Sequence, residues 1–276
     1  MKALVSAAFL LALATSVAFP DETIFTDGFE APRSCWEGGG FVGKLDLCFD
    51  VPFGITPPVT MDSVEASTEI PRADLIIGMD TTGSMIGEIA NLKSTASTII
   101  DEFLLRSKDG AVSVAAYDDY PLLPYGNESL GDRAFYLLHR SMTISTPAGK
   151  TSVISAINTL TTHNGADTPE SGWEMVQQVA TGLGSGGDPY GVPLFNPATA
   201  PPVSIPEGEE TGEVGGVGIR DGSMPILLWI SDAPSHNSTV TGNNYQAIPG
   251  VNPANSAQAI ASMNNIGGRI IGVMSG

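Results

Sequence analysis

The sequence predicts an α/β fold whose central sheet is mostly parallel and covered by helices on both faces. From residue 73 onward, short apolar runs alternate with helix-length segments whose apolar residues recur at helical spacing. Short apolar runs are typical of buried parallel strands, and their alternation with helices is typical of a doubly wound sheet. The chain has 276 residues, of which 42% are hydrophobic. One large domain, or one domain with a smaller region, can therefore bury a core.

Each expected element follows from its local pattern. The run 75–79 (LIIGM) predicts the first strand, which ends at Asp80. Apolar residues at helical spacing predict a helix over 84–105. Thr168 and Pro169 have the character of a helix N-cap followed by proline at the first helical position. The remaining expected elements are strands at 111–117 and 134–142, helices at 152–160 and 169–180, a strand at 226–230, a helix at 255–264 and a strand at 269–274.

Two connections are much longer than ordinary loops. Residues 184–222 are rich in Gly and Pro, and residues 233–252 are mostly polar. The first connection starts at the opposite end of the sheet from Asp80, and its length alone does not make it a binding loop. The second connection follows Asp232 directly, so we expect it to lie beside any site built on that residue.

The amino terminus has the pattern of an export signal. Residues 1–18 combine Lys2, an apolar stretch and small residues before a cleavage site after Ala18. Residues 19–71 are expected to form a small loop-rich region and linker, in which Cys35 and Cys48 form a disulfide, because an exported protein meets an oxidising compartment. Residues 72–276 form the main domain. Secretion, cell-surface attachment or a periplasmic location are all compatible with export.

The charge balance limits the class of partner. The formal net charge is −18, with 12 Lys and Arg against 30 Asp and Glu. Nucleic-acid binding requires basic residues to neutralise phosphates, and anionic membrane surfaces repel an acidic protein. No stretch after the signal is apolar and long enough to span a membrane. A cationic ligand or a metal ion is favoured instead, although acidic surfaces also serve solubility.

Oxygen-bearing side chains gather directly after the first predicted strand. Asp80, Thr82 and Ser84 alternate along the turn DTTGS, and ligands of open α/β sheets bind at the carboxyl ends of strands. A carboxylate and two hydroxyls are hard-oxygen ligands that suit Mg²⁺, and also Mn²⁺ or Ca²⁺. By itself, Asp80 is equally consistent with a carboxylate that stabilises a helix N-terminus.

Three segments together resemble the von Willebrand factor A domain family and its metal-ion-dependent adhesion site. Residues 73–89 (ADLIIGMDTTGSMIGEI) match the first metal-binding loop, and residues 230–234 (ISDAP) match the third, with Asp232 in the ligand position. Residues 165–170 (GADTPE) stand where the second loop is expected. Either Asp167 or Thr168 is the ligand that this loop supplies.

The resemblance implies a Rossmann-like, doubly wound and mostly parallel sheet with one antiparallel edge strand. It also implies that a bound divalent cation, Mg²⁺ before Mn²⁺ or Ca²⁺, recruits an Asp or Glu carboxylate from a protein partner. The family normally continues with one more helix, strand and helix, whereas this chain ends after the fifth expected strand. An extracellular or cell-surface adhesion module, not an enzyme, is the leading interpretation.

Further polar residues are expected near the same end of the sheet. Asp118 and Asp119 follow the second strand, where they either bind a second ion or hold the rim; the family often carries a similar Asp-Tyr-Pro sequence there, which favours a structural role. His236, close behind Asp232, is expected at the rim or simply on the surface. None of the three histidines is assigned a catalytic role.

Two alternatives stay open. One is a metal-free structural or matrix module. The other is an aspartyl-phosphate-forming phosphotransferase or phosphatase with Asp80 as the nucleophile, since DTTGS also resembles the D-x-T-G-T loop of such enzymes. That chemistry requires a lysine and a further acidic pair on the same sheet, and no lysine follows Lys150.

Overall fold

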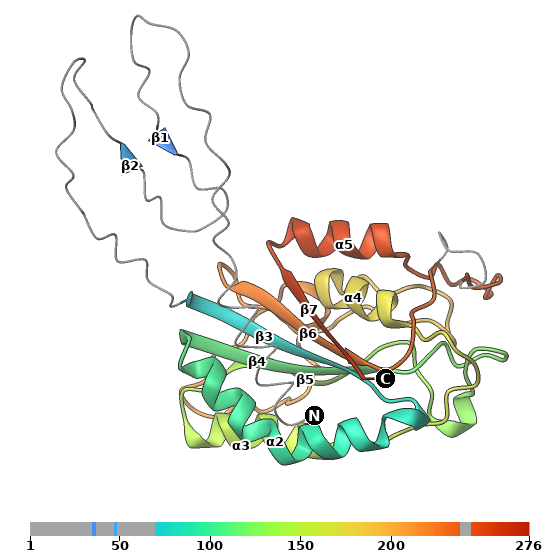
Figure 1. Ribbon diagram of the computed structural model, residues 1–276, viewed down its shortest axis with the longest axis horizontal. Helices are drawn as coiled ribbons and strands as arrows, with labels where there is room; N and C mark the ends of the chain where they lie inside the picture. Colours follow the sequence, from blue (N-terminus) through green and yellow to red (C-terminus); the bar gives the residue numbers. More distant parts are fainter. Residues whose placement is uncertain (1–34, 37–46, 49–69, 238–243, 276) are drawn as a thin grey trace, which may run out of the picture. The chain divides into compact units, whose positions relative to one another are not determined.

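The computed structural model describes residues 35–36, 47–48, 70–237 and 244–275 (Figure 1). The chain divides into two compact units, one of which contains Thr68–Gly276 and the other Thr15–Ser67. In the smaller unit, strands β1 (Cys35–Trp36) and β2 (Leu47–Cys48) pair antiparallel with Cys35 opposite Cys48. The side chains of these cysteines lie outside the described residues, and so does the signal segment. The disulfide and the signal therefore stay predictions.

The larger unit is built on a five-stranded sheet in the order β5-β4-β3-β6-β7. The strands are β3 (Ile70–Asp80), β4 (Ser107–Tyr117), β5 (Tyr136–Thr143), β6 (Met224–Ser231) and β7 (Arg269–Met274). Four strands are parallel, and β5 runs antiparallel at one edge. The mostly parallel sheet with one antiparallel edge strand is thus confirmed.

Helices cover both faces of this sheet (Figure 1). Helices α2 (Ile86–Leu104) and α3 (Pro147–Thr159) lie on one face, and α4 (Gly172–Thr181) and α5 (Ser256–Asn265) lie on the other. Each layer encloses its own apolar cluster. Side chains of β3 alternate between the two, since Leu75 and Ile77 join one cluster and Ile76 joins the other.

The expected elements all occur, with shifts at their ends. The strand expected at 269–274 has the bounds of β7. Helix α4 begins at Gly172 rather than at Pro169, so the N-cap reading of Thr168 was wrong. The Ser171 side chain at the true N-cap donates instead to the carbonyls of Asp118 and Ala134. Residues 168–171 therefore stay extended enough to run beside the loop after β6.

The second half of the connection 184–222 is fastened to the amino-terminal end of the sheet. The Arg220 guanidinium lies 2.9 Å from Asp74 and also pairs with Asp109, and it is only 2% exposed. Glu209 accepts hydrogen bonds from Thr143, Ser145 and Thr146. This connection is thus an ordered covering of the fold, anchored by charge.

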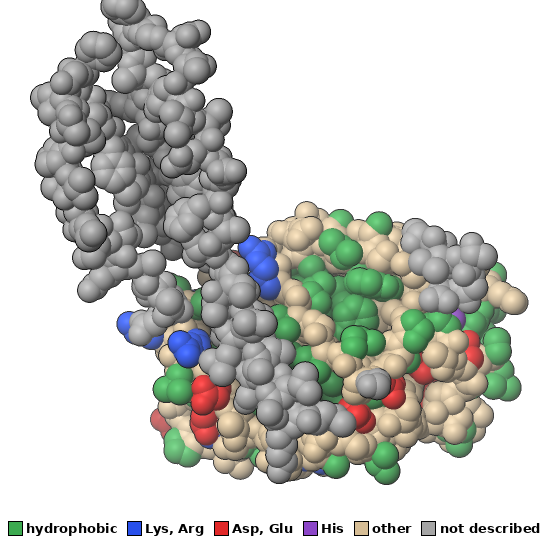
Figure 2. Space-filling view, viewed as in Figure 1, with side chains coloured by type: hydrophobic (Ala, Val, Ile, Leu, Met, Phe, Trp, Pro, Cys, Tyr) green, Lys and Arg blue, Asp and Glu red, His purple; other side chains and the backbone are tan. Residues whose placement is uncertain are grey.

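The β7 edge is less well covered than the rest of the sheet. Figure 2 shows hydrophobic side chains gathered over β6 and β7. Ile270, Ile271 and Val273 are only partly buried, and Met274 is 61% exposed. Within the described part of the chain, no helix has the length and apolar character needed to cross a membrane.

Candidate functional site

The carboxyl ends of three neighbouring parallel strands carry the polar residues singled out in the sequence. Asp80 ends β3, Asp118 directly follows β4 and Asp232 directly follows β6. Because these strands are adjacent and parallel, their ends meet at one edge of the sheet. The loop before α4 joins them there, since the Glu170 N–H donates to the Pro234 carbonyl over 2.9 Å. The structure therefore brings the three expected loops together.

Asp80 is buried and held rigidly by hydroxyl and amide donors. Its Oδ1 accepts hydrogen bonds from the Thr82 N–H at 2.9 Å and the Thr82 hydroxyl at 2.8 Å, and its Oδ2 accepts one from the Ser231 hydroxyl at 2.7 Å. Ser84 is exposed and donates to Asp232 Oδ1 at 3.1 Å. The site thus has a buried carboxylate floor and a solvent-facing hydroxyl–carboxylate pair.

Glu170 is the site residue that the sequence analysis did not select. Its side chain is only 4% exposed, and its Oε2 has no hydrogen-bond partner. An ideal Cβ added at Gly165 would lie 3.1 Å from Thr82 Cγ2 and 3.5 Å from Glu170 Oε1. The Glu170 carboxyl therefore faces the Asp80 turn across a glycine that leaves room for it. An acidic residue within the quoted GADTPE segment was a signal that could have found it.

Among the described residues, no Lys or Arg forms a recorded ion pair with the carboxylates at this end of the sheet. Burial, followed by the charges of Asp80, Asp119, Asp167 and Asp118, raises the pKa of Glu170 to about 10. Burial also raises the pKa of Asp80 to about 6, with a smaller contribution from Asp232. Among the described residues, the recorded ion pairs of Lys and Arg lie elsewhere, and those at this end involve only histidines. A bound cation would supply the missing compensation.

The donor set fits a hard divalent cation. Asp80, Asp232 and Glu170 offer carboxylate oxygens, and Ser84 and Thr82 offer hydroxyl oxygens, as Mg²⁺, Mn²⁺ and Ca²⁺ prefer. The orphaned Glu170 Oε2 is the observation that favours such an ion, because an unsatisfied buried carboxylate oxygen is costly.

The two predicted second-loop ligands take different places. Thr168 is exposed, whereas Asp167 Oδ2 lies 3.6 Å from His236 Nε2. Asp167 therefore faces His236, while Glu170 faces Asp80. Asp118 and Asp119, expected to bind a second ion or to hold the rim, are fully buried, and His236 is 3% exposed rather than on the surface.

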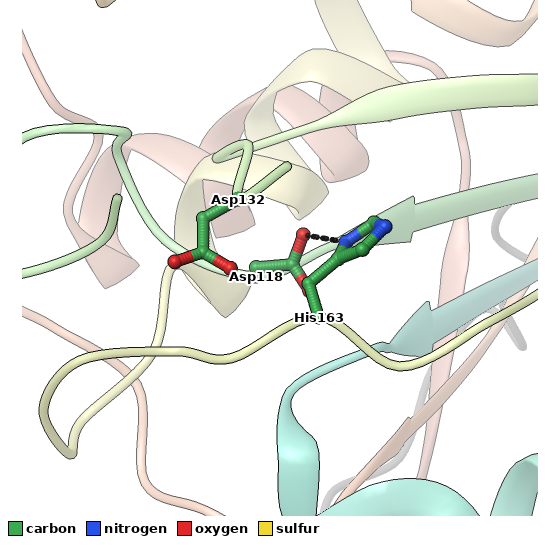
Figure 3. Close-up of side chains that lie close together, drawn as sticks. All are labelled: Asp118, Asp132 and His163. Carbon is green, nitrogen blue, oxygen red and sulfur yellow. Dashed lines mark hydrogen bonds and ion pairs between the residues drawn. The ribbon is translucent and has the colours of Figure 1, made fainter. Parts of the chain in front are cut away.

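Asp118 belongs to a buried cluster with Asp132 and His163 (Figure 3). Asp118 Oδ1 accepts from the Thr81 hydroxyl at 2.7 Å, and Oδ2 accepts from His163 Nδ1 at 2.8 Å. The hydrogen bond to Asp118, ahead of other influences, raises the pKa of His163.

The second carboxylate of this cluster, Asp132, is equally engaged. It accepts from the backbone N–H groups of Asn127, Asn164 and Gly165. The hydrogen bonds of these two aspartates thus join the turn after β4 to the loop before α4.

The chain was compared with known proteins in three ways. No protein-family model matches it, and no curated protein matches it. Among solved structures, proximal thread matrix protein 1 from the mussel byssus is 11% identical with a TM-score of 0.38, over 74% of this chain and 38% of that one. Another structure of the same mussel protein gives 13% identity and the same TM-score, over 74% of this chain and 37% of that one.

The pilus adhesin SpaC from Lactobacillus rhamnosus GG is 10% identical with a TM-score of 0.37, over 74% of this chain and 25% of that one. The chain thus spans well under half the length of these structures. At this level of likeness, the functional interpretation depends on the site's own geometry.

Proposed function

We propose that residues 72–276 form an exported, metal-dependent protein-binding module of the von Willebrand factor A type. A divalent cation, Mg²⁺ first, would be held by Asp80, Ser84, Asp232 and Glu170 at the carboxyl end of the sheet. The observation that carries this proposal is the buried Glu170 Oε2, which has no hydrogen-bond partner and is subject to the negative charges of Asp80, Asp119, Asp167 and Asp118.

The residues would divide the work of binding. Asp80 is fixed by Thr82 and Ser231, so its oxygens need no rearrangement. Ser84 and Asp232 lie toward solvent, where a partner can approach. The bound cation would supply an electrophilic centre that a partner's Asp or Glu carboxylate can complete. Hydrogen bonds to Asp80 withdraw charge from it, which preserves that electrophilicity.

A binding role is proposed rather than a catalytic one. Both oxygens of Asp80 already accept hydrogen bonds from Thr82 or Ser231, which makes Asp80 a poor nucleophile. The long connection after Asp232 borders the site and would select the partner. Its backbone is tied to the second loop, because the His236 N–H donates to the Glu170 carbonyl at 2.7 Å.

Thermal unfolding of the full chain with Mg²⁺, Mn²⁺, Ca²⁺ or a chelator tests the proposal. Mg²⁺ or Ca²⁺ should raise the Tm of the wild-type protein and leave that of Asp80→Ala unchanged, because only an ion that binds the folded state stabilises it. Asp221→Ala is the matched control, since Asp221 is an exposed carboxylate in the connection fastened to the opposite end of the sheet. If metal leaves the wild-type Tm unchanged, the metal-free structural module replaces this proposal.

The open coordination position has its own test. With Mn²⁺ bound, acetate should displace coordinated water and lower the proton relaxation enhancement of the wild-type protein. An enhancement that does not respond to acetate would contradict recruitment of a partner carboxylate.

A further inference from the structure

A second group of metal-ligand side chains lies at the same end of the sheet but does not include the ligands proposed above. It consists of Asp119, Asp167 and His236, each of which offers a ligand atom within 4.8 Å of the others. The three residues come from three separate segments: the turn after β4, the loop before α4 and the loop after β6. Such convergence of distant segments on one point requires the folded chain.

The carboxylate oxygens in this cluster are poorly satisfied. Asp119 is fully buried, and its Oδ1 accepts from the Tyr120 N–H at 2.5 Å and the Tyr245 hydroxyl at 2.6 Å. Its Oδ2 has no well-aligned hydrogen bond, although His236 Nε2 lies 3.2 Å away. Asp167 Oδ1 is also buried without a hydrogen-bond partner. Among the described residues, His236 Nε2 is therefore the recorded partner of Asp119 Oδ2, and Asp167 Oδ1 has none.

The imidazole itself is held in a fixed orientation. The His236 ring stacks on Tyr245 with centroids 4.0 Å apart and meets the edge of Tyr125 at 5.3 Å. The Tyr125 hydroxyl accepts from the Gln246 N–H, and the Tyr245 hydroxyl bonds Asp119. These aromatic contacts keep Nε2 directed at Asp119 and Asp167. A rigid ligand loses little freedom when a metal binds.

A third buried carboxyl is coupled to this group by charge. Glu170 is 4% exposed, its Oε2 has no hydrogen-bond partner, and Asp119 and Asp167 are among the charges that act on it. The Asp118–Asp132–His163 cluster differs, because its carboxylates are occupied by backbone and hydroxyl donors. Buried carboxyl oxygens without a hydrogen bond therefore occur at Asp119, Asp167 and Glu170, whereas Asp118 and Asp132 have no such oxygen.

We propose that Asp119, Asp167 and His236 form a second metal site that takes Zn²⁺, and more weakly Mn²⁺, in preference to Mg²⁺ or Ca²⁺. The imidazole nitrogen sets this preference, since Zn²⁺ and related ions bind His and carboxylate together, whereas Mg²⁺ and Ca²⁺ select oxygen alone. By coordinating all three residues, the ion would cross-link the loop after β6, the turn after β4 and the loop before α4. The site is assigned from its own residues and does not require an ion at the Asp80 site.

Imidazole coordination has a direct spectroscopic signature. Pulsed electron paramagnetic resonance of the Mn²⁺-loaded full chain should show ¹⁴N coupling from a coordinated histidine, because the proposed ligands around Asp80 are all oxygens. The coupling should disappear in His236→Gln and persist in His163→Gln and His139→Gln, which remove the only other histidines of the chain. Absence of the coupling in wild type, or its survival in His236→Gln, overturns the proposal.

Calorimetric titration with Zn²⁺ provides the second measurement. His236→Gln should weaken Zn²⁺ binding at least tenfold, and Asp167→Asn, at a half-buried position, should also weaken it if the histidine variant fails to fold. Asp80→Ala should retain both the ¹⁴N coupling and the Zn²⁺ affinity while it loses the Mg²⁺ response. Equal Zn²⁺ affinity in wild type and both cluster variants would reduce the group to an ordinary His–carboxylate ion pair. Failure at one site is thus distinguishable from failure at the other.

Discussion

The two ends of the parallel sheet hold their buried carboxylates in opposite ways. At the amino-terminal end, Asp74 is fully buried but lies 2.9 Å from the Arg220 guanidinium. At the carboxyl end, Asp80 and Glu170 are buried to a similar degree, and no described Arg or Lys forms an ion pair with them. The buried carboxylate at the first end thus has an internal cation, whereas those at the second end have no Lys or Arg partner among the described residues.

This difference indicates that the amino-terminal end of the sheet serves stability and that the carboxyl end is available for binding. A buried carboxylate with an internal cation is satisfied permanently, so nothing more can bind to it. A buried carboxylate without one either takes a proton, as the raised pKa of Glu170 indicates, or awaits an external cation. The second half of the connection 184–222, fastened by Arg220, thus has a structural role, while residues 233–237 lie beside the loop that carries Glu170, where an external ion would act.

Removal of the Arg220 charge at the amino-terminal end should cause the greatest loss of stability among the changes considered. Arg220→Met should lower the free energy of unfolding by about 3 to 5 kcal/mol, because Asp74 would be left buried without a partner. Chemical denaturation measures this loss. Arg269→Met, at an exposed position, should change stability by less than about 0.5 kcal/mol. A cost for Arg220→Met as small as that of the control would remove the contrast between the two ends.

At the carboxyl end of the sheet, added metal should stabilise the folded protein. An ion at about 100 times its Kd should stabilise the wild-type protein by about 2.7 kcal/mol. Glu170→Gln should lose that gain. Without metal it should change stability little at pH 7, because Glu170 is already protonated there. Thermal unfolding with and without chelator measures both quantities, and a full metal response in Glu170→Gln would exclude this residue as a ligand.

The pH dependence of the metal-free protein follows from raised carboxyl pKa values. Asp80 shifts from 3.8 when unfolded to about 6 when folded, mainly through burial, and Asp119 shifts to about 6 for the same first reason. Folding then favours the protonated form, so their contribution is fully present below pH 3.8 and is lost as pH rises to about 6. The slope is about 1.4 kcal/mol per pH unit for each group at most.

Denaturant midpoints between pH 4 and 7, measured in chelator, test that slope. Asp80→Asn should reduce it, and saturating metal should flatten it because metal and protons compete for the same oxygens. Stability that instead rises with pH over this range would show that these carboxylates are compensated inside the fold.

Loss of the Glu209 charge, also at the amino-terminal end, should have a smaller effect on stability than the loss of Arg220. Glu209 caps the turn before α3 by accepting from Thr143, Ser145 and Thr146, and these hydrogen bonds lower its pKa against the opposing effect of burial. Glu209→Gln should cost about 1 kcal/mol, since the amide keeps the shape but loses the charge. The loss should be the same with and without metal. A metal-dependent loss would mean that the two ends are coupled.

Local sequence pattern was sufficient to predict the order of the elements and the ligand residues of two of the three site loops. Apolar runs such as 75–79 and 226–230 can only be buried, and a polar turn that follows such a strand is carried to the sheet edge with it. Asp80, Ser84 and Asp232 could be selected for this reason. The antiparallel edge strand was implied by the family resemblance and is confirmed by the pairing of β5 with β4.

Which side chain of the second loop faces Asp80 depends on the tertiary structure. Asp167, Thr168 and Glu170 lie within four positions of the chain, yet their side chains take different directions. Asp167 faces His236, Thr168 is exposed and Glu170 faces Asp80. Their directions depend on where α4 begins and on the backbone pairing of Glu170 with Ser235, which join segments far apart in sequence. Local pattern fixes which residues can bind an ion, but the neighbours that charge, bury and orient them are supplied by the fold.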